Sequence, residues 1–209
     1  MLGLLCVSST PIYACINSYT LDLIPNRYDT AKERIEVYQE QLNTFKKDYT
    51  VTSNYKKQND YAVLLIMTDR FAEAIQLLQN IEKQHPGLAK TAVNLGTAYE
   101  LSGQYKLAEQ WIQKGMQRDP KIHQGSEWIH VNILQAKQNI QSQPDWFTRH
   151  PILNIDFGKR YFPEAVTLSK QKISTEQLQQ AKEQATIQLT ERSQFLFDQD
   201  PVVARVYYD

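Results

Sequence analysis

The sequence predicts an all-α protein in which antiparallel helix-turn-helix units stack on one another as a solenoid. The first observation is a recurring offset of 34 residues, a period typical of helical-repeat architectures. It separates two prolines and five further pairs of positions: Pro86 and Pro120, Tyr61 and Leu95, Ala62 and Gly96, Phe71 and Tyr105, Ala74 and Ala108, and Leu78 and Ile112. The second is composition, because only 7 Gly and 8 Pro among 209 residues suit helices with short turns better than a glycine-rich sheet.

Charge and composition narrow the classes of partner. Lys and Arg together number 23, Asp and Glu also number 23, and 42% of the residues are apolar. A chain of this length buries a sizeable core without disulfides. A nucleic-acid partner is not expected, because its phosphate backbone requires a basic surface. No polybasic tract is present that would bind an anionic membrane surface.

Residues 89–122 form one complete unit of two helices. The first helix is expected over about 91–102, followed by Gly103, a residue type that commonly ends helices. The second helix should begin near Tyr105 and end before Pro120, because proline cannot continue the interior of a helix. The facing sides of the two helices combine small residues at the crossing with apolar residues at spacings of three and four: Gly96 and Ala108, with Leu95, Tyr99, Leu107, Trp111 and Ile112.

This unit resembles a tetratricopeptide repeat. The residues that carry the resemblance are Leu95-Gly96-x-x-Tyr99, Ala108, Ile112 and Pro120. The preceding unit, at about 55–88, is similar through Tyr61-Ala62-x-x-Leu65, Ala74, Leu78 and Pro86. The resemblance implies a right-handed superhelix of stacked repeats, a tetratricopeptide-like α-solenoid. It also implies a non-enzymatic protein that binds a protein or peptide partner on its concave face. Longer stretches resemble a group of little-characterised bacterial tetratricopeptide proteins: 94–101, 125–137 and 154–158.

Further helices should extend the repeats into a tetratricopeptide-like domain over 16–142. A helix at about 31–47 follows the capping box Thr30-x-x-Glu33 and should cover the open end of the stack. A half repeat is expected at 123–141, because Pro144 and Pro151 interrupt the pattern where its second helix should follow.

The remainder divides into an irregular segment at 143–168 and C-terminal helices within 169–209. The irregular segment is rich in aromatic residues and should pack against the helices: Trp146, Phe147, Phe157, Tyr161 and Phe162. One helix, at about 175–195, is expected after the capping box Ser174-x-x-Gln177. Another should start with Pro201 in its first turn, and the pattern there predicts that the chain is truncated or that this helix docks as a cap.

Residues 1–15 predict export. They are apolar but too short and too interrupted to span a bilayer, and Ala14 is the small residue expected before a signal cleavage site. Residues 12–15 also resemble a bacterial lipobox, in which Cys15 would be acylated. Lipidation would explain a lone Cys in an exported chain, because Cys6 would leave with the signal. We therefore expect a periplasmic protein or one anchored in the envelope membrane only through Cys15. The alternatives are a cleaved signal without lipid and a cytoplasmic protein with an apolar first helix.

One group of residues raises the possibility of metal chemistry. His123, Glu127 and His130 have spacings that place them on one helical face, and Glu and His three residues apart also occur in di-iron bundles. A site of that class needs matching ligands from other helices, and His85 and His150 do not supply them. A metal-binding or hydrolytic protein using this helix and the aromatic segment is the alternative to a binding module.

Other catalytic patterns are missing from the sequence. There is no phosphate-binding loop and no nucleophile elbow, and no cofactor is expected. Asp145 and Asp156 flank the aromatic segment and could form a carboxylate pair in a sugar cleft, although a solvated loop is the simpler interpretation. Four aromatic residues could form a binding platform but are more typical of a core: Trp128, Trp146, Phe147 and Phe157.

The concave surface of the stack is the main candidate site. The first helices of successive repeats line this surface, which predicts a mixed polar groove for an extended or helical peptide. The residues expected on it are Lys56, Asn59, Val63, Lys90, Val93, Asn94, Thr97, Gln124, Glu127 and Trp128. Asn94 and Lys90 would suit the clamp with which some tetratricopeptide domains hold a peptide carboxylate, whereas Asn59 and Val63 depart from that pattern. Scaffolding of envelope assembly is a narrower version of the same function.

Overall fold

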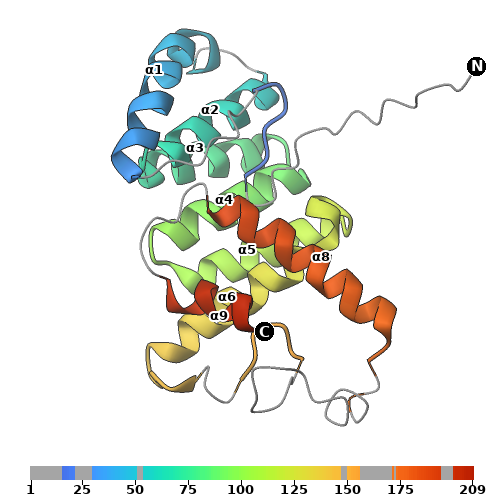
Figure 1. Ribbon diagram of the computed structural model, residues 1–209. Helices are drawn as coiled ribbons and strands as arrows, with labels where there is room; N and C mark the ends of the chain where they lie inside the picture. Colours follow the sequence, from blue (N-terminus) through green and yellow to red (C-terminus); the bar gives the residue numbers. More distant parts are fainter. Residues whose placement is uncertain are drawn as a thin grey trace, which may run out of the picture.

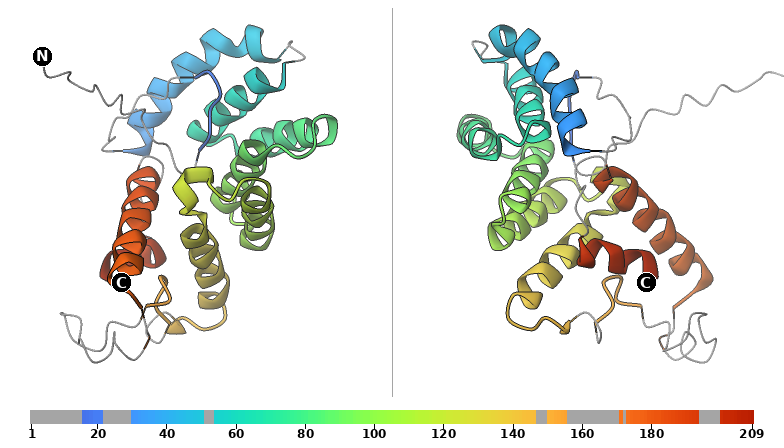
Figure 2. Two further views of the ribbon diagram at one scale, coloured as in Figure 1. Left: turned by 90° about the vertical axis from the view of Figure 1, so that its right-hand side faces the viewer. Right: turned by 60° about the vertical axis from the view of Figure 1, so that its left-hand side comes forward.

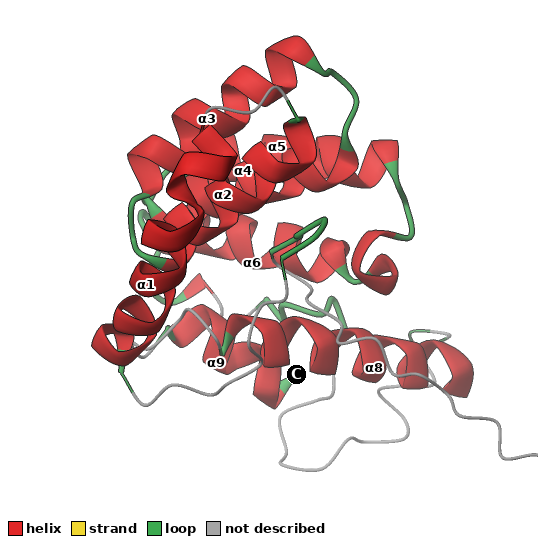
Figure 3. Ribbon diagram, turned by 90° about the horizontal axis from the view of Figure 1, so that it is seen from above, coloured by secondary structure: helices red, strands yellow, loops and turns green. Residues whose placement is uncertain are grey.

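The computed structural model describes residues 16–21, 30–50, 54–146, 150–155, 171, 173–193 and 200–209, and these contain helices but no strand. Helices that follow one another in the chain pack side by side from α1 to α6 (Figure 1). Viewed from above, the described residues are helices joined by turns and loops (Figure 3). The all-helical solenoid predicted from the sequence is thus confirmed.

Two complete helical pairs form the centre of the stack. The first pair is α2 (Tyr55–Met67) and α3 (Phe71–Gln84), and the second is α4 (Ala89–Leu101) and α5 (Tyr105–Arg118). Helix α1 (Ala31–Thr50) packs on α2 and covers the end of the stack, as expected. Buried Arg34 of α1 donates to Asp69 in the α2–α3 turn at 2.7 Å and so ties the two elements together.

The predicted caps are present. Ser174 and Gln177 form the reciprocal capping box that opens α8 (Thr175–Arg192). The Asp200 carboxylate accepts the amides of Val202 and Val203 at the start of α9 (Pro201–Tyr208). These side chains satisfy amides that have no partner within the helix. The Thr30 hydroxyl likewise accepts the Glu33 amide at 3.1 Å before α1.

The inner and outer helices of the pairs differ in burial. Outer helices α3 and α5 bury one stripe each, as amphipathic helices do. Inner helix α2 is buried continuously from Asn59 to Met67, and α4 from Thr91 to Glu100. A helix buried on all sides must also be covered on its concave face, so this face of the stack is not open.

Gly96 sets the approach of α4 to α5. A Cβ at this position would lie 2.6 Å from Cδ1 of Ile112 and 3.1 Å from the carbonyl oxygen of Ala108. Any larger side chain would force the helix axes apart, which confirms the prediction that small residues lie at this crossing. Leu107 departs from its prediction: it is 39% exposed, because it lies on the outer side of α5.

The third unit begins differently from the first two. A short 3-10 turn, η1 (Ile122–Gly125), precedes α6 (Glu127–Ile140). Within the turn, His123 and Gln124 have φ values of 48° and 55°, a left-handed conformation that L-residues seldom adopt. His123 therefore lies outside the helix, and the half repeat predicted to start at 123 has a helix that starts four residues later.

The C-terminal helices α8 and α9 pack on α6. Helices α6, α8 and α9 share an apolar cluster distinct from that of the repeats, and Figure 2 shows α8 running alongside α6. Ile152, Leu153 and Ile155 are buried in this cluster and Trp146 packs on its edge, so part of the irregular segment packs as predicted. The other aromatic residues of that segment lie outside the described residues: Phe147, Phe157, Tyr161 and Phe162.

We predict that Gly96→Ala destabilises the fold by about 1–3 kcal/mol, the usual cost of overpacking a core. Its methyl group would overlap the Ile112 side chain. Urea unfolding of Gly96→Ala, Ile112→Ala and the double variant measures the coupling. The added cost of Gly96→Ala should shrink when Ile112 is shortened, and strict additivity would contradict this account.

Candidate functional site

Residues 16–21 lie in the concave face of the repeats, against α2 and α4. The segment is drawn in blue beside α2 in Figure 1 and can be followed in both views of Figure 2. Ile16 and Leu21, at its two ends, are buried in the apolar core of the repeats. The groove thus holds a short stretch of the same chain that is neither helix nor strand.

Two asparagines bind the main chain of Asn17. The amide of Asn17 donates to Oδ1 of Asn94 at 2.7 Å. Its carbonyl accepts from Nδ2 of Asn94 and from Nδ2 of Asn59, both at 2.8 Å. Nδ2 of Asn94 also donates to Oδ1 of Asn59 at 3.2 Å, which fixes the orientation of both amides. Both asparagines are fully buried, and these bonds satisfy polar groups that would otherwise be costly there.

Asp60 and Lys90 bind the next three residues. Nζ of Lys90 donates to the carbonyl of Ser18 at 2.8 Å. The Asp60 carboxylate accepts the amides of Tyr19 and Thr20 at 2.6 and 2.7 Å, and the Thr20 hydroxyl at 2.7 Å. Bonds to a charged acceptor are stronger than neutral ones, so Asp60 is the firmest anchor of the segment.

The ring of Tyr19 sits in a small niche between α2 and α4. Tyr55 meets it edge to face with ring centroids 5.8 Å apart. The ammonium groups of Lys90 and Lys56 lie 4.8 and 5.9 Å from the ring centroid, within the range of cation–π attraction. Burial, together with nearby Tyr55 and Asp60, raises the pKa of the Tyr19 phenol to about 12. Tyr19 is therefore neutral at physiological pH.

Four of the residues predicted for the groove contact this segment: Lys56, Asn59, Lys90 and Asn94. The prediction missed Asp60. Its signal was present, because Asp60 lies 34 positions before Asn94 and so occupies the same place in the preceding repeat. The groove residues predicted for that repeat were Lys56, Asn59 and Val63, which include the neighbour of Asp60 but not Asp60 itself.

Three other predicted residues do not line an open groove, and their assignment is corrected. Val63, Val93 and Thr97 are fully buried. Val93 faces α5, since its Cγ2 would lie 2.4 Å from a Cβ placed on Gly115. These side chains have no surface left for a partner, because the concave face of α2 and α4 is covered.

Helix α8 covers the groove positions of the third unit. Nε1 of Trp128 donates to Oε1 of Gln184 at 2.7 Å, and Nε2 of Gln184 donates to the carbonyl of Gly125 at 3.2 Å. Gln124 is exposed in η1, whereas Glu127 is buried. The prediction that Glu127 and Trp128 line an open groove is therefore wrong, because α8 lies over this part of the concave face.

A buried charge cluster joins α4, α6 and α8. Its centre is Glu100, at the end of α4, which accepts two bonds from Arg192 of α8 at 2.9 and 3.0 Å. The same carboxylate accepts from Lys137 at 2.8 Å and pairs with Nε2 of His130 at 2.6 Å. Lys137 also pairs with Asp200 at 2.7 Å, which adds α9 to the cluster. Burial opposes the charge on Glu100, but Arg192, Lys137 and His130 hold its pKa well below the usual range.

Glu127 continues the cluster toward η1. Its carboxylate pairs with Nδ1 of His130 at 3.0 Å and with Nδ1 of His123. Burial works against the charged form, but the two histidines lower the pKa of Glu127 to about 2. For His130, burial and Arg192 oppose protonation, and Glu100 and Glu127 outweigh them and raise its pKa above 6.5. His130 thus lies between two carboxylates as a cation.

The three residues of the metal hypothesis do come together, but they bind one another. His123 and His130 each turn Nδ1 toward Glu127, and the second nitrogen of His130 faces Glu100. Within the described part of the chain, no group of three or more His, Cys, Asp or Glu could hold a metal ion. The geometry is that of a structural ion cluster. Of the proposed carboxylate pair, Asp145 is exposed, and Asp156 lies outside the described residues, as does Cys15.

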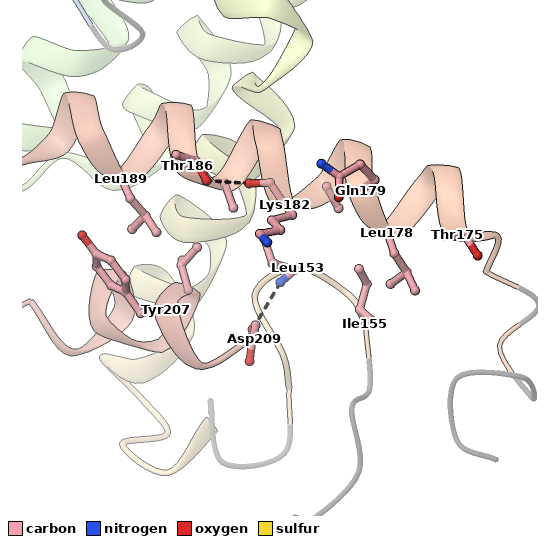
Figure 4. A pocket seen from close by; sticks show the side chains of 13 residues that line it. Leu153, Ile155, Thr175, Leu178, Gln179, Lys182, Thr186, Leu189, Tyr207 and Asp209 are labelled. Carbon is pink, nitrogen blue, oxygen red and sulfur yellow. Dashed lines mark hydrogen bonds between the residues drawn. The ribbon is translucent and has the colours of Figure 1, made fainter. Parts of the chain in front are cut away.

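A second concavity of about 470 Å³ lies between α8, α9 and residues 150–155 (Figure 4). Its lining is mainly apolar, including Leu153, Leu178 and Leu189. Asp209 stands at its edge and accepts the amides of Ile152 and Leu153. The space could hold an apolar group, and its polar side chains form no acid–base pair.

Helical pairs with a recurring 34-residue offset define a helical-repeat solenoid, and its concave face holds residues 16–21 of the same chain. Residues 65–128 match the family model described as tetratricopeptide repeat, which confirms for this part of the chain the resemblance found in the sequence. Comparisons with curated proteins and with solved structures gave no significant match. Among the described residues, no helix is long and apolar enough to cross a membrane.

We predict that Asp60→Ala releases the amides of Tyr19 and Thr20. These amides lose a charged acceptor worth about 1.5–3 kcal/mol, so their hydrogen exchange should accelerate roughly tenfold or more. Exchange followed by mass spectrometry or NMR measures the effect. Asp119→Ala is the matched control, because Asp119 accepts the Lys121 amide in a turn that makes no contact with the segment. Unchanged exchange in Asp60→Ala would contradict the role of Asp60.

The charge cluster predicts a stability that declines above pH 6.5. The pKa of His130 is raised in the folded protein, so its contribution is complete below 6.5 and falls as pH rises through the folded pKa. Denaturant unfolding at a series of pH values should show this decline in the wild type. It should be weaker in His130→Gln, which does not titrate. Identical slopes for the two proteins would contradict the assignment.

Proposed function

We propose that this chain is a non-enzymatic module that binds an extended segment of another protein in the concave groove of its tetratricopeptide repeats. The observation that carries the proposal is the docking of residues 16–21, whose main-chain groups meet Asn59, Asp60, Lys90 and Asn94. A surface that binds main-chain amides and carbonyls of one short segment is suited to another of the same backbone shape.

The family supports the same function. Tetratricopeptide repeats generally mediate protein–protein interactions, and stacked repeats create concave binding surfaces. The bonds to the backbone favour a peptide over a small metabolite, because amides and carbonyls must alternate at fixed spacing to meet them. We place this activity in a bacterial cell envelope, as a scaffold or adaptor there, on the basis of residues 1–15 and the lipobox-like sequence ending at Cys15.

Site-specific photo-cross-linking in the native cell tests the proposal. A photoreactive phenylalanine analogue at Lys56, which is exposed beside the groove, should form an adduct with another protein. The same analogue at Lys106, exposed on outer helix α5, is the matched control and should not form it. Asn94→Ala should abolish the adduct, because it removes two bonds to an occupant's backbone and the bond that orients Asn59.

Mass spectrometry of the adduct then locates the cross-link in the partner. A single short segment of the partner is the expected result, and the cell fraction that holds the adduct tests the proposed location. Adducts that form equally from both positions, or that persist in Asn94→Ala, would show that partners are not bound in the groove.

A further inference from the structure

The contacts of residues 16–21 divide into those that any sequence could make and those that need particular side chains. Asn59 and Asn94 bind main-chain atoms alone, so they fix the path of an occupant and not its sequence. Lys90 donates to a main-chain carbonyl but also faces the Tyr19 ring. Selectivity must come from the contacts in which the occupant's own side chains take part, and five residues of the segment make such contacts.

Two of these residues, Tyr19 and Thr20, are adjacent in the segment. The Tyr19 ring occupies the niche formed by Tyr55 and the two lysine ammonium groups, which attract the face of an aromatic ring and give an aliphatic side chain no comparable interaction. The Thr20 hydroxyl donates to Oδ2 of Asp60, the oxygen that also accepts the Thr20 amide. An aromatic residue followed by a hydroxyl residue is therefore the pair that this groove favours.

The other three residues, Ser18, Ile16 and Leu21, shape the segment and anchor its ends. The Ser18 hydroxyl donates to the carbonyl of Leu21 at 2.7 Å and closes the bend through Tyr19 and Thr20. Ile16 and Leu21 enter the apolar core at the two ends. A matching segment carries apolar residues at its ends and a Ser before the aromatic residue.

The chain's own segment satisfies this pattern imperfectly. Nδ2 of Asn17 is buried and has no hydrogen-bond partner within the described residues, and an unmet buried donor weakens binding. The segment compensates through its covalent attachment, because a short tether holds a ligand at a high effective concentration. We therefore expect a separate segment without the unpaired amide to bind the same groove more tightly in its own right.

We propose that the groove selects partner proteins carrying a Ser-aromatic-(Ser/Thr) stretch between apolar residues, and that residues 16–21 occupy the groove as an intramolecular competitor of such partners. This inference rests on the proposed function and adds to it the sequence of the partner segment and a control on its binding. Binding of the partner requires release of residues 16–21, so the resting protein is self-blocked.

The experiment uses the full chain and a fluorescent peptide, Ile-Asn-Ser-Tyr-Thr-Leu, that copies residues 16–21. Fluorescence anisotropy measures its affinity for the wild type, Tyr19→Ala and Tyr19→Phe. Tyr19→Ala weakens the internal ligand, so the peptide should bind this variant at least about tenfold more tightly than the wild type. Tyr19→Phe keeps the ring and loses only the hydroxyl's hydrogen bond with Thr91, so the peptide should bind this variant much more weakly than Tyr19→Ala. Circular dichroism confirms that the three proteins are folded alike.

Peptide variants test the selectivity on the Tyr19→Ala protein. Replacing the peptide Tyr by Ala, or its Thr by Val, should lower affinity at least about tenfold, whereas Phe and Ser in the same places should preserve it. Adding Asp60→Ala to Tyr19→Ala should abolish binding, which establishes that the peptide occupies the groove and not another surface.

Several outcomes would overturn the inference. Equal peptide affinity for wild type and Tyr19→Ala would contradict the proposed competition by residues 16–21. Equal affinity of all peptide variants would contradict the proposed sequence preference. If the peptide did not bind Tyr19→Ala at all, both parts of the inference would be contradicted. A groove-dependent cross-link in cells would still support the proposed function. A wild-type dimer in sedimentation that becomes monomeric in Tyr19→Ala would identify a second copy of this chain as the occupant in place of a partner protein.

Discussion

Helix α4 is buried on every side from Thr91 to Glu100, and every polar group along it must therefore find a partner inside the protein. Two of these groups, the amide of Asn94 and the carboxylate of Glu100, point away from the apolar core shared with α5. Residues 16–21 satisfy the first, and α6 with α8 satisfies the second. This one requirement explains why residues 16–21 cover one end of the concave face and why α6 and α8 cover the other.

The elements that cover the two ends of the concave face differ in how firmly they are bound to it. At Glu100, Arg192 and Lys137 are buried charges, and removing one partner of such a pair leaves the other unpaired at a cost of several kcal/mol. Residues 16–21 are held mainly by bonds that water or another backbone can replace, and they bury few apolar side chains. The C-terminal end of the concave face is therefore an integral part of the fold, whereas the segment at the end near α2 is held by bonds that can be replaced, which is consistent with the exchange proposed above.

Local signals in the sequence determine most of the repeat architecture. The offset of 34 located both helical pairs, and Gly96 marked the close crossing because only a small residue fits between α4 and Ile112. Capping residues such as Ser174 fixed where helices begin. Each of these features acts over a few residues or one repeat period, so a single chain displays it.

The covering of the groove could not be predicted in the same way. Asn17 contacts Asn94 across 77 positions of the chain. Because residues 16–21 are irregular and have no periodic pattern, their sequence does not predict that contact. An open groove would leave alternating buried and exposed positions on α2 and α4, and the structure shows continuous burial instead. The sequence carries a trace of this only in α2, as the unbroken apolar run from Tyr61 to Met67. His123, Glu127 and His130 drew attention as possible ligands, because spacing alone does not distinguish a metal site from an ion cluster.

The bond between Glu100 and Arg192 spans 92 positions of the chain, which gives this protein a folding behaviour unlike that of a simple solenoid. Repeat arrays ordinarily gain structure through neighbour contacts and can fray from either end. Here the loop closed by α8 must form after the local helical pairs, because its closure entropy is recovered only once Glu100 is in place. Because Arg192 of α8 and Glu100 of α4 are buried together, the C-terminal helices are coupled to the repeats, and we expect the two parts to unfold as one cooperative unit.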